Sequence, residues 1–350
     1  MKIKLLVFIL PLLALLPALT GCNDEPDFEN TPYGNFDALA DIIDTRYCFF
    51  QAKDIDWKEV TQRYRSQVNS QMSVVELFNL CAAMLDELED GHVNLSSYFS
   101  SSYYRAWWSD YPQNFNLRTL QEYYLDFNYF QTSGISYRIL GENTGYLYYP
   151  SFSTQIGEIN LDYILALLSD TDALIIDIRD NGGGLLSNIE TLVGRFIDRE
   201  ICGGYITHKT GPGHADFSEP YEIRYKPAPE NRIKWSVDKP VYVLTNRSCF
   251  SAANDFVAVM KSLPNVKIVG ARTGGGGGLP FSSELPIGWS IRFSACPIYA
   301  PDGSETEFGI EPTEGCEAEC TAEELAAGKD AILDLALSLA AQATASGGKK

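Results

Sequence analysis

The chain has 350 residues, of which 45% are hydrophobic and 21% are charged, values typical of a globular protein with a sizeable core. Its formal net charge is −19. This acidic balance argues against a nucleic-acid-binding protein, because that binding depends on Lys and Arg side chains that neutralise phosphates.

The N-terminus has the pattern of an export signal. Two lysines precede an apolar run from Leu5 to Leu19 that is short and interrupted by prolines, so we expect a signal peptide over residues 1–21 rather than a membrane span. The run ends in Leu-Thr-Gly-Cys22, which resembles a bacterial lipobox. The resemblance implies that Cys22 carries lipids after cleavage. The acidic residues that follow predict a solvated tether over residues 22–34.

Residues 35–98 are predicted to form an N-terminal helical subdomain. Apolar residues recur at three- and four-residue steps over residues 36–50 and again over residues 74–88. Ser73 and Glu76 have the spacing of a capping box at the start of the later helix.

Residues 99–342 are predicted to form the core domain. The part up to residue 140 is rich in aromatic residues without helical periodicity, which favours short strands and loops. Strands and helices then alternate, and we expect strands at 144–150, 173–178, 241–245 and 266–270, and helices at 159–168, 187–198 and 251–263. Continuous apolar strands joined by helices imply parallel crossovers in a sheet that is buried on both faces. One final helix is expected from Thr321, followed by a polar tail over residues 343–350.

Ser251 is a candidate nucleophile because it lies between a buried strand and a helix. At such a junction a hydroxyl can project, and the first helical amides can stabilise an oxyanion. The alternative is that Ser251 only caps the helix. Among the three histidines, His208 and His214 lie in a polar stretch typical of a surface loop, whereas His92 lies on a turn between apolar segments.

Two glycine-rich segments can bring backbone amides close to a ligand. Residues 180–184 follow a buried strand, but they lack the Gly-Lys-Ser/Thr of a phosphate-binding loop and the spacing of a dinucleotide site. Residues 273–278 allow either a ligand-binding backbone or a mobile loop. Cys316 and Cys320 have no histidine or second cysteine pair at zinc-like spacing, so we expect no metal.

Six short segments occur in a fixed order along the chain. They are Asp90-Gly91-His92, Gly145–Phe152, Leu174–Gly184, Ser251–Asn254, Val269–Gly274 and Gly309–Pro312. Together they resemble the tail-specific (C-terminal processing) protease family over about residues 35–340. The resemblance implies an α/β (α+β) fold with a crotonase-like or ClpP-like core, and serine peptidase activity without a cofactor.

The family has two catalytic arrangements, and this chain resembles only one of them. One branch uses a lysine downstream of the serine, but position 276, where that lysine would fall, is glycine. The other branch, similar to the tricorn core protease, takes a histidine from a Gly-His turn. This resemblance implies Ser251 as nucleophile and His92 as base.

The resemblance also implies the remaining catalytic groups. The oxyanion is expected to bind the amide of Ala252 and an amide of the Gly182–Gly183 turn. The acid that orients the histidine is expected just before the Gly-Ile-x-Pro motif, where Glu307 is favoured and Glu305 competes.

The segment between His92 and Gly145 is too short for the PDZ domain that many family members carry, so we do not predict tail specificity. The aromatic stretch over residues 103–108, with Tyr123 and Tyr124, can line a groove or pack in a core.

The predicted function is a serine endopeptidase that cleaves peptides or unfolded proteins outside the cytoplasm, and that is held in the cell envelope by lipids on Cys22. The alternatives are a non-catalytic peptide- or hydrophobic-ligand-binding lipoprotein on the same fold and a glycan-binding surface lipoprotein. Natural substrate, disulfide pairing and oligomeric state stay open.

Overall fold

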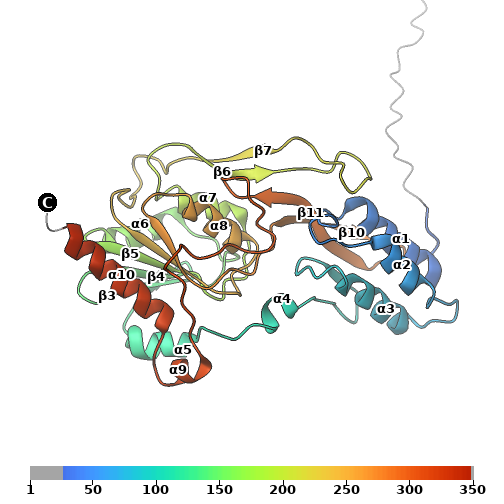
Figure 1. The fold of residues 1–350 in the computed structure, drawn as a ribbon, viewed down its shortest axis with the longest axis horizontal. Coiled ribbons are helices and arrows are strands. Elements are labelled where there is room, and N and C mark those ends of the chain that lie inside the picture. Colours follow the sequence, from blue (N-terminus) through green and yellow to red (C-terminus); the bar gives the residue numbers. More distant parts are fainter. Residues whose placement is uncertain (1–26, 348–350) are drawn as a thin grey trace, which may run out of the picture.

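Two β-sheets organise the chain, and helices pack on their faces (Figure 1). The computed structural model describes residues 27–347, so the predicted signal peptide and Cys22 lie outside the described residues. The helices are α1 (Pro32–Arg46), α2 (Trp57–Arg65), α3 (Val74–Asp86), α4 (Ala106–Ser109), α5 (Leu117–Thr119), η1 (Leu120–Tyr124), α6 (Glu158–Leu168), α7 (Leu186–Val193), α8 (Ala252–Lys261), α9 (Ala322–Ala326) and α10 (Ala331–Gly347). The strands are β1 (Asn94–Ser96), β2 (Phe130–Thr132), β3 (Ile135–Leu140), β4 (Thr144–Tyr148), β5 (Ala173–Asp177), β6 (Ile201–Ile206), β7 (Tyr221–Tyr225), β8 (Val241–Thr245), β9 (Val266–Gly270), β10 (Gly278–Glu284) and β11 (Ser290–Tyr299).

The six-stranded sheet has the order β2-β3-β4-β5-β8-β9. Strands β4, β5, β8 and β9 run parallel, whereas β2 and β3 add antiparallel strands at one edge. The predicted α/β core of parallel strand-helix-strand units is therefore confirmed.

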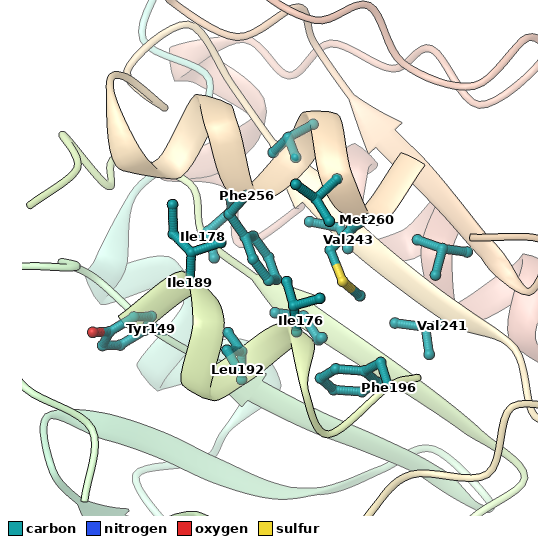
Figure 2. Packing of buried hydrophobic residues seen from close by; sticks show 14 of the residues in the cluster. Tyr149, Ile176, Ile178, Ile189, Leu192, Phe196, Val241, Val243, Phe256 and Met260 are labelled. Atoms are coloured by element: carbon teal, nitrogen blue, oxygen red, sulfur yellow. The ribbon is translucent and has the colours of Figure 1, made fainter. Parts of the chain in front are cut away.

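Helices cover both faces of this sheet. Helices α6, α7 and α8 pack on one face, where Ile176 and Val243 contact the layer of Ile189 and Phe256 (Figure 2). The other face packs against α10, which contributes a row of apolar residues beginning with Ile332. Because successive strand residues point to opposite faces, both faces need apolar residues, and this explains the continuous apolar runs in the sequence.

A second sheet, which the sequence did not predict, has the order β1-β11-β6-β7, with β10 also paired to β11. Helix α1 packs on β11 and α3 packs on α1 and β1, and Leu39 and Met84 share one apolar cluster with Trp289 and Phe293. Register shifts interrupt the β10–β11 pairing at Leu279/Pro280 and the β6–β7 pairing between Cys202 and Gly204. Such bulges and glycines break the alternation by which strands are recognised.

The predicted helix at 187–198 is too long, because α7 ends at Val193. Beyond it, the carbonyls of Gly194 and Arg195 accept hydrogen bonds from the amides of Ala228 and Trp235, so a crossing segment takes the place of the next helical turn. The buried guanidinium of Arg195 pairs with Glu158 and Asp162.

The single final helix is also wrong, because the chain forms two helices there. The capping box of Thr321 and Glu324 is present, but Gly328 adopts a φ of +83° after α9. The Asp330 carboxylate then accepts the amide hydrogen of Leu333 at 3.1 Å and starts α10. The aromatic segment after residue 99 contains α4, α5 and η1, where only strands and loops were expected.

Among residues 27–347, no helix is long and apolar enough to cross a membrane. All seven cysteines in this part of the chain are free thiols.

Candidate active site

Ser251 lies at the junction of strand β8 and helix α8, in an unusual backbone conformation. Its φ of 57° and ψ of −125° are sparsely populated for a residue with a side chain, and such strain is typical of functional sites. The Ser251 amide donates to the Gly275 carbonyl at 2.8 Å. The side chain makes no capping hydrogen bond to the helix, so the interpretation of Ser251 as only a helix cap is wrong.

His92 meets Ser251 directly, although 159 positions separate them in the sequence: His92 Nε2 and Ser251 Oγ are 3.0 Å apart. The ring is 3% exposed and packs against Phe250 at a centroid distance of 4.7 Å. Burial lowers the pKa of His92 to about 4, with smaller contributions from Arg292 and Lys53 and opposition from Asp90. The imidazole is therefore neutral at neutral pH and can accept a proton.

The Asn181–Gly183 turn lies against the first residues of α8. Gly183 has a φ of +92°, and a Cβ added there would come within 2.9 Å of the Ser251 Cβ and the Ala252 nitrogen, so only glycine fits. The Gly183 amide donates to Asn181 Oδ1 at 3.0 Å. Within the described part of the chain, the amides of Gly182 and Ala252 have no acceptor. Of the three amides expected to bind the oxyanion, those of Gly182 and Ala252 thus have no acceptor among the described residues, whereas that of Gly183 already donates to Asn181.

Asn181, which sequence reasoning missed, fixes this turn. Its Oδ1 also accepts from the Phe152 amide at 3.1 Å, and its Nδ2 donates to the Tyr149 carbonyl at 2.9 Å. Its own carbonyl accepts from the Phe250 amide at 3.1 Å. The side chain and the carbonyl of this one buried residue together connect the loop after β4 to the segment that carries the nucleophile.

Glu307 is buried, but the structure does not bring it to His92. Its Oε1 pairs with Lys53 Nζ at 2.8 Å, and its Oε2 accepts from the Gly277 amide at 3.0 Å. Burial raises the pKa of Glu307 to about 8, with a contribution from Asp90 and opposition from Lys53. In the described chain His92 Nδ1 has no hydrogen-bond partner. Glu305 lies nearby in sequence with an exposed side chain.

A cluster of charged residues that the sequence did not predict surrounds the turn that carries His92, and it consists of Asp90, Lys53 and Glu307. Asp90 Oδ1 accepts from the His92 amide at 2.7 Å, and Asp90 Oδ2 accepts from the Tyr47 hydroxyl at 3.1 Å. Lys53 Nζ donates to the carbonyls of Leu88 and Glu89 at 3.3 and 2.9 Å as well as pairing with Glu307. Lys53 thereby holds the turn that presents the histidine.

Replacing Lys53 by methionine is expected to lower the free energy of unfolding by about 1–3 kcal/mol, because the buried Glu307 carboxyl group and the carbonyls of Leu88 and Glu89 lose their donor. Urea denaturation measures the change, and Lys58→Met on the exposed side of α2 is the matched control. Adding Glu307→Gln to Lys53→Met should cost much less than the sum of the single changes. Strictly additive effects would contradict this coupling.

The glycine run over residues 273–278 is buried, so the mobile-loop alternative is wrong. Gly276 donates to the Glu307 carbonyl at 3.1 Å, and a Cβ on Gly275 would come within 1.8 Å of that same oxygen. These glycines let the turn that carries Glu307 lie close to the backbone of the nucleophile.

A cavity of about 880 Å³ opens beside the Ser251–His92 pair, and Gly91 and Phe250 are in its wall. Tyr104 and Trp107 from the aromatic stretch also line it, and the Trp107 ring stacks on Phe250 at 4.1 Å. Tyr124 lies elsewhere, where its hydroxyl bonds to Asp334 at 2.9 Å. Part of the aromatic stretch therefore lines a cavity next to the site.

The chain is similar to known peptidases in sequence and in fold. The model of Peptidase family S41 matches residues 143–315, and that of the Tricorn protease C1 domain matches residues 28–86. The crystal structure of a putative peptidase from Parabacteroides merdae ATCC 43184 is 45% identical and covers 89% of this chain and 97% of that chain, with a TM-score of 0.83. Mature CPAF, 15% identical, covers 86% and 94% of the two chains with a TM-score of 0.67, which shows a shared fold.

Curated relatives are matched over a shorter length. The carboxy-terminal processing protease CtpB of Bacillus subtilis (strain 168) is 25% identical over 181 residues, which are 50% of this chain and 34% of that protein. The chain thus spans about a third of the length of the curated relatives it matches.

Proposed function

This chain belongs to peptidase family S41, and on that premise we propose that it is a serine endopeptidase that hydrolyses peptides or unfolded proteins outside the cytoplasm. The observation that carries the proposal is the 3.0 Å contact between Ser251 Oγ and His92 Nε2, next to two unoccupied backbone amides. A protein that only binds ligands has no need of this pair.

In the proposed reaction, His92 Nε2 removes the proton from the Ser251 hydroxyl as the oxygen attacks the scissile carbonyl. The tetrahedral oxyanion is stabilised by the amides of Ala252 and Gly182. His92 then donates its proton to the leaving amine, and an acyl-enzyme remains. Water, deprotonated by the same imidazole, attacks the ester and releases the acid product.

We also propose how the acidic residues Asp90 and Glu307 assist His92. Asp90 fixes the turn through the His92 amide, and its charge favours the imidazolium that forms during attack. Glu307 was expected to orient the ring directly. We propose that it acts through Lys53, which it anchors against the carbonyls of residues 88 and 89.

We also propose that lipids on Cys22 hold the protein in the cell envelope, with the folded body carried on the acidic segment that follows. The support is the sequence of the export signal and its lipobox. The mass of the mature protein tests this: an acylated Cys22 is expected, and an unmodified N-terminus would contradict it.

The function is tested by intact-mass detection of a fluorophosphonate adduct. The wild-type protein is expected to gain one adduct that peptide mapping places on Ser251, with or without chelator. A folded, monodisperse protein that takes up no label and cleaves no unfolded substrate would favour the alternative of a ligand-binding lipoprotein on the same fold.

The pH dependence of hydrolysis follows from the burial of the base. Because the pKa of His92 is lowered to about 4, the imidazole stays neutral well below pH 6.5, and kcat at saturating substrate should persist to about pH 5 and fall below about pH 4. Hydrolysis of a fluorescent unfolded protein measures this profile, and circular dichroism at each pH controls for folding. A half-maximal loss near pH 6.5 in folded protein would refute the prediction.

A further inference from the structure

A second cavity, of about 430 Å³, lies beside the helix that begins at the nucleophile. It is bounded by α7, α8 and strands β6, β7 and β11. It shares no lining residue with the first cavity, which is lined by Trp107. Its walls are mostly apolar, with Leu186, Ile206, Ile223, Val259 and Ile298 among them.

Asp255 brings an unpartnered carboxyl group into this cavity. The residue is 8% exposed, and its Oδ1 is fully buried without a hydrogen-bond partner among the described residues. Burial alone raises the pKa of Asp255 to about 7. An isolated carboxylate in such a place costs free energy unless a cation or a donor accompanies it, so the group is suited to a ligand that supplies one.

The charges around the cavity favour a cation. Among the described residues that line it, Arg224 alone is basic, and its guanidinium donates to Glu200 and Glu222 at 3.0 and 2.6 Å. Glu190, exposed on α7, adds a further negative charge to the wall. An apolar cavity with one buried acid fits a side chain that has an aliphatic stem and a cationic end.

The position of Asp255 connects the cavity to the proposed reaction. Its amide donates to the Ser251 carbonyl at 3.0 Å, which places it one helical turn after the nucleophile. Ser251 is the N-cap of α8 and Asp255 lies in its first turn, while Leu186 of the cavity wall follows the Gly182–Gly183 turn by three residues. The cavity is therefore adjacent both to the helix that follows the nucleophile and to the turn that carries a proposed oxyanion donor.

We propose that this cavity is the specificity pocket for the residue on the N-terminal side of the cleaved bond, and that it selects lysine or arginine through an ion pair with Asp255. The proposal rests on the proposed peptidase function and names its substrate class. The aliphatic stem contacts the apolar wall, and the ammonium or guanidinium group is the partner that Asp255 lacks.

The test compares peptides that differ only at the cleaved position, with lysine against norleucine and arginine against citrulline. The wild-type protein is expected to prefer the cationic member by at least about 30-fold in kcat/KM, the effect of a buried charge pair. Asp255→Asn, which keeps the shape of the side chain, should abolish the preference. Asp198→Asn, an exposed change outside both cavities, should keep it.

Active-site titration with the fluorophosphonate normalises each variant to its folded fraction, so a loss of folding is not mistaken for a loss of selectivity. Cleavage sites mapped by mass spectrometry in an unfolded protein provide a second readout, and they should follow lysine and arginine. Cleavage after apolar residues, or a preference that survives Asp255→Asn, overturns the pocket assignment and leaves the peptidase function standing. The absence of both cleavage and label overturns the peptidase function itself.

Discussion

Replacing Ser251 by alanine is expected to lower kcat for hydrolysis of an unfolded protein by about 10⁴- to 10⁶-fold, because the reaction loses its nucleophile. The fold should persist, since the hydroxyl makes no capping bond and alanine meets the same backbone strain as serine. Residual hydrolysis is measured by quantifying new N-termini over long incubations. His92→Ala should cause a loss of similar size, because residues that act as a unit are not additive.

Ser262→Ala, at the other end of the same helix, is the matched control for Ser251→Ala and should keep full activity. The double variant Ser251→Ala/His92→Ala should be no slower than either single variant. If Ser251→Ala keeps more than a tenth of the wild-type rate, another residue is the nucleophile and the proposed mechanism is wrong.

Replacing Arg179 by methionine is expected to lower the free energy of unfolding by about 3–5 kcal/mol. The guanidinium is fully buried, and it donates to Asp177 Oδ2 at 2.6 Å and to Asp330 Oδ1 at 2.8 Å. Methionine keeps much of the volume but leaves two buried carboxylates without a counter-charge. Since Asp177 ends β5 and Asp330 starts α10, the loss should weaken the attachment of that helix to the sheet.

Urea denaturation measures this loss, and Arg224→Met is the control. Arg224 pairs with Glu200 and Glu222 while 58% of its own side chain is exposed, so its removal should cost at most about 1 kcal/mol. Adding Asp330→Asn to Arg179→Met should recover part of the stability. Equal losses of unfolding free energy in Arg179→Met and Arg224→Met would contradict the prediction that the buried ion pairs contribute more to stability than the exposed ones.

The sequence predicted the parallel sheet well, because each central strand is buried on both faces. Strand β5 is apolar from Ala173 to Ile176 and lies between two helical layers, so no polar residue interrupts the signal. The second sheet could not be predicted in the same way. Strand β6 contains two glycines and a register shift, and strand β7 is mostly exposed, so neither strand has a clear apolar pattern.

The candidate nucleophile and base could be predicted because each lies in a short motif with its own local geometry. The groups that surround them could not, because they meet only through long-range contacts. Lys53 reaches Glu307 across most of the chain, and nothing in the local sequence around Lys53 distinguishes it from a surface lysine. Asp255 is similarly ordinary in the sequence, and only the packing of β6, β7 and β11 against α8 encloses it.

The distance between His92 and Ser251 along the chain has a consequence for the order of events during biosynthesis. A chain that emerges from the translation or export machinery presents the histidine 159 residues before the serine, and strand β11, on which the histidine's subdomain packs, emerges later still. The pair can form only after these distant parts have docked. A nascent or unfolded copy therefore has no His92–Ser251 contact. The proposed peptidase activity would therefore begin only with the completed fold.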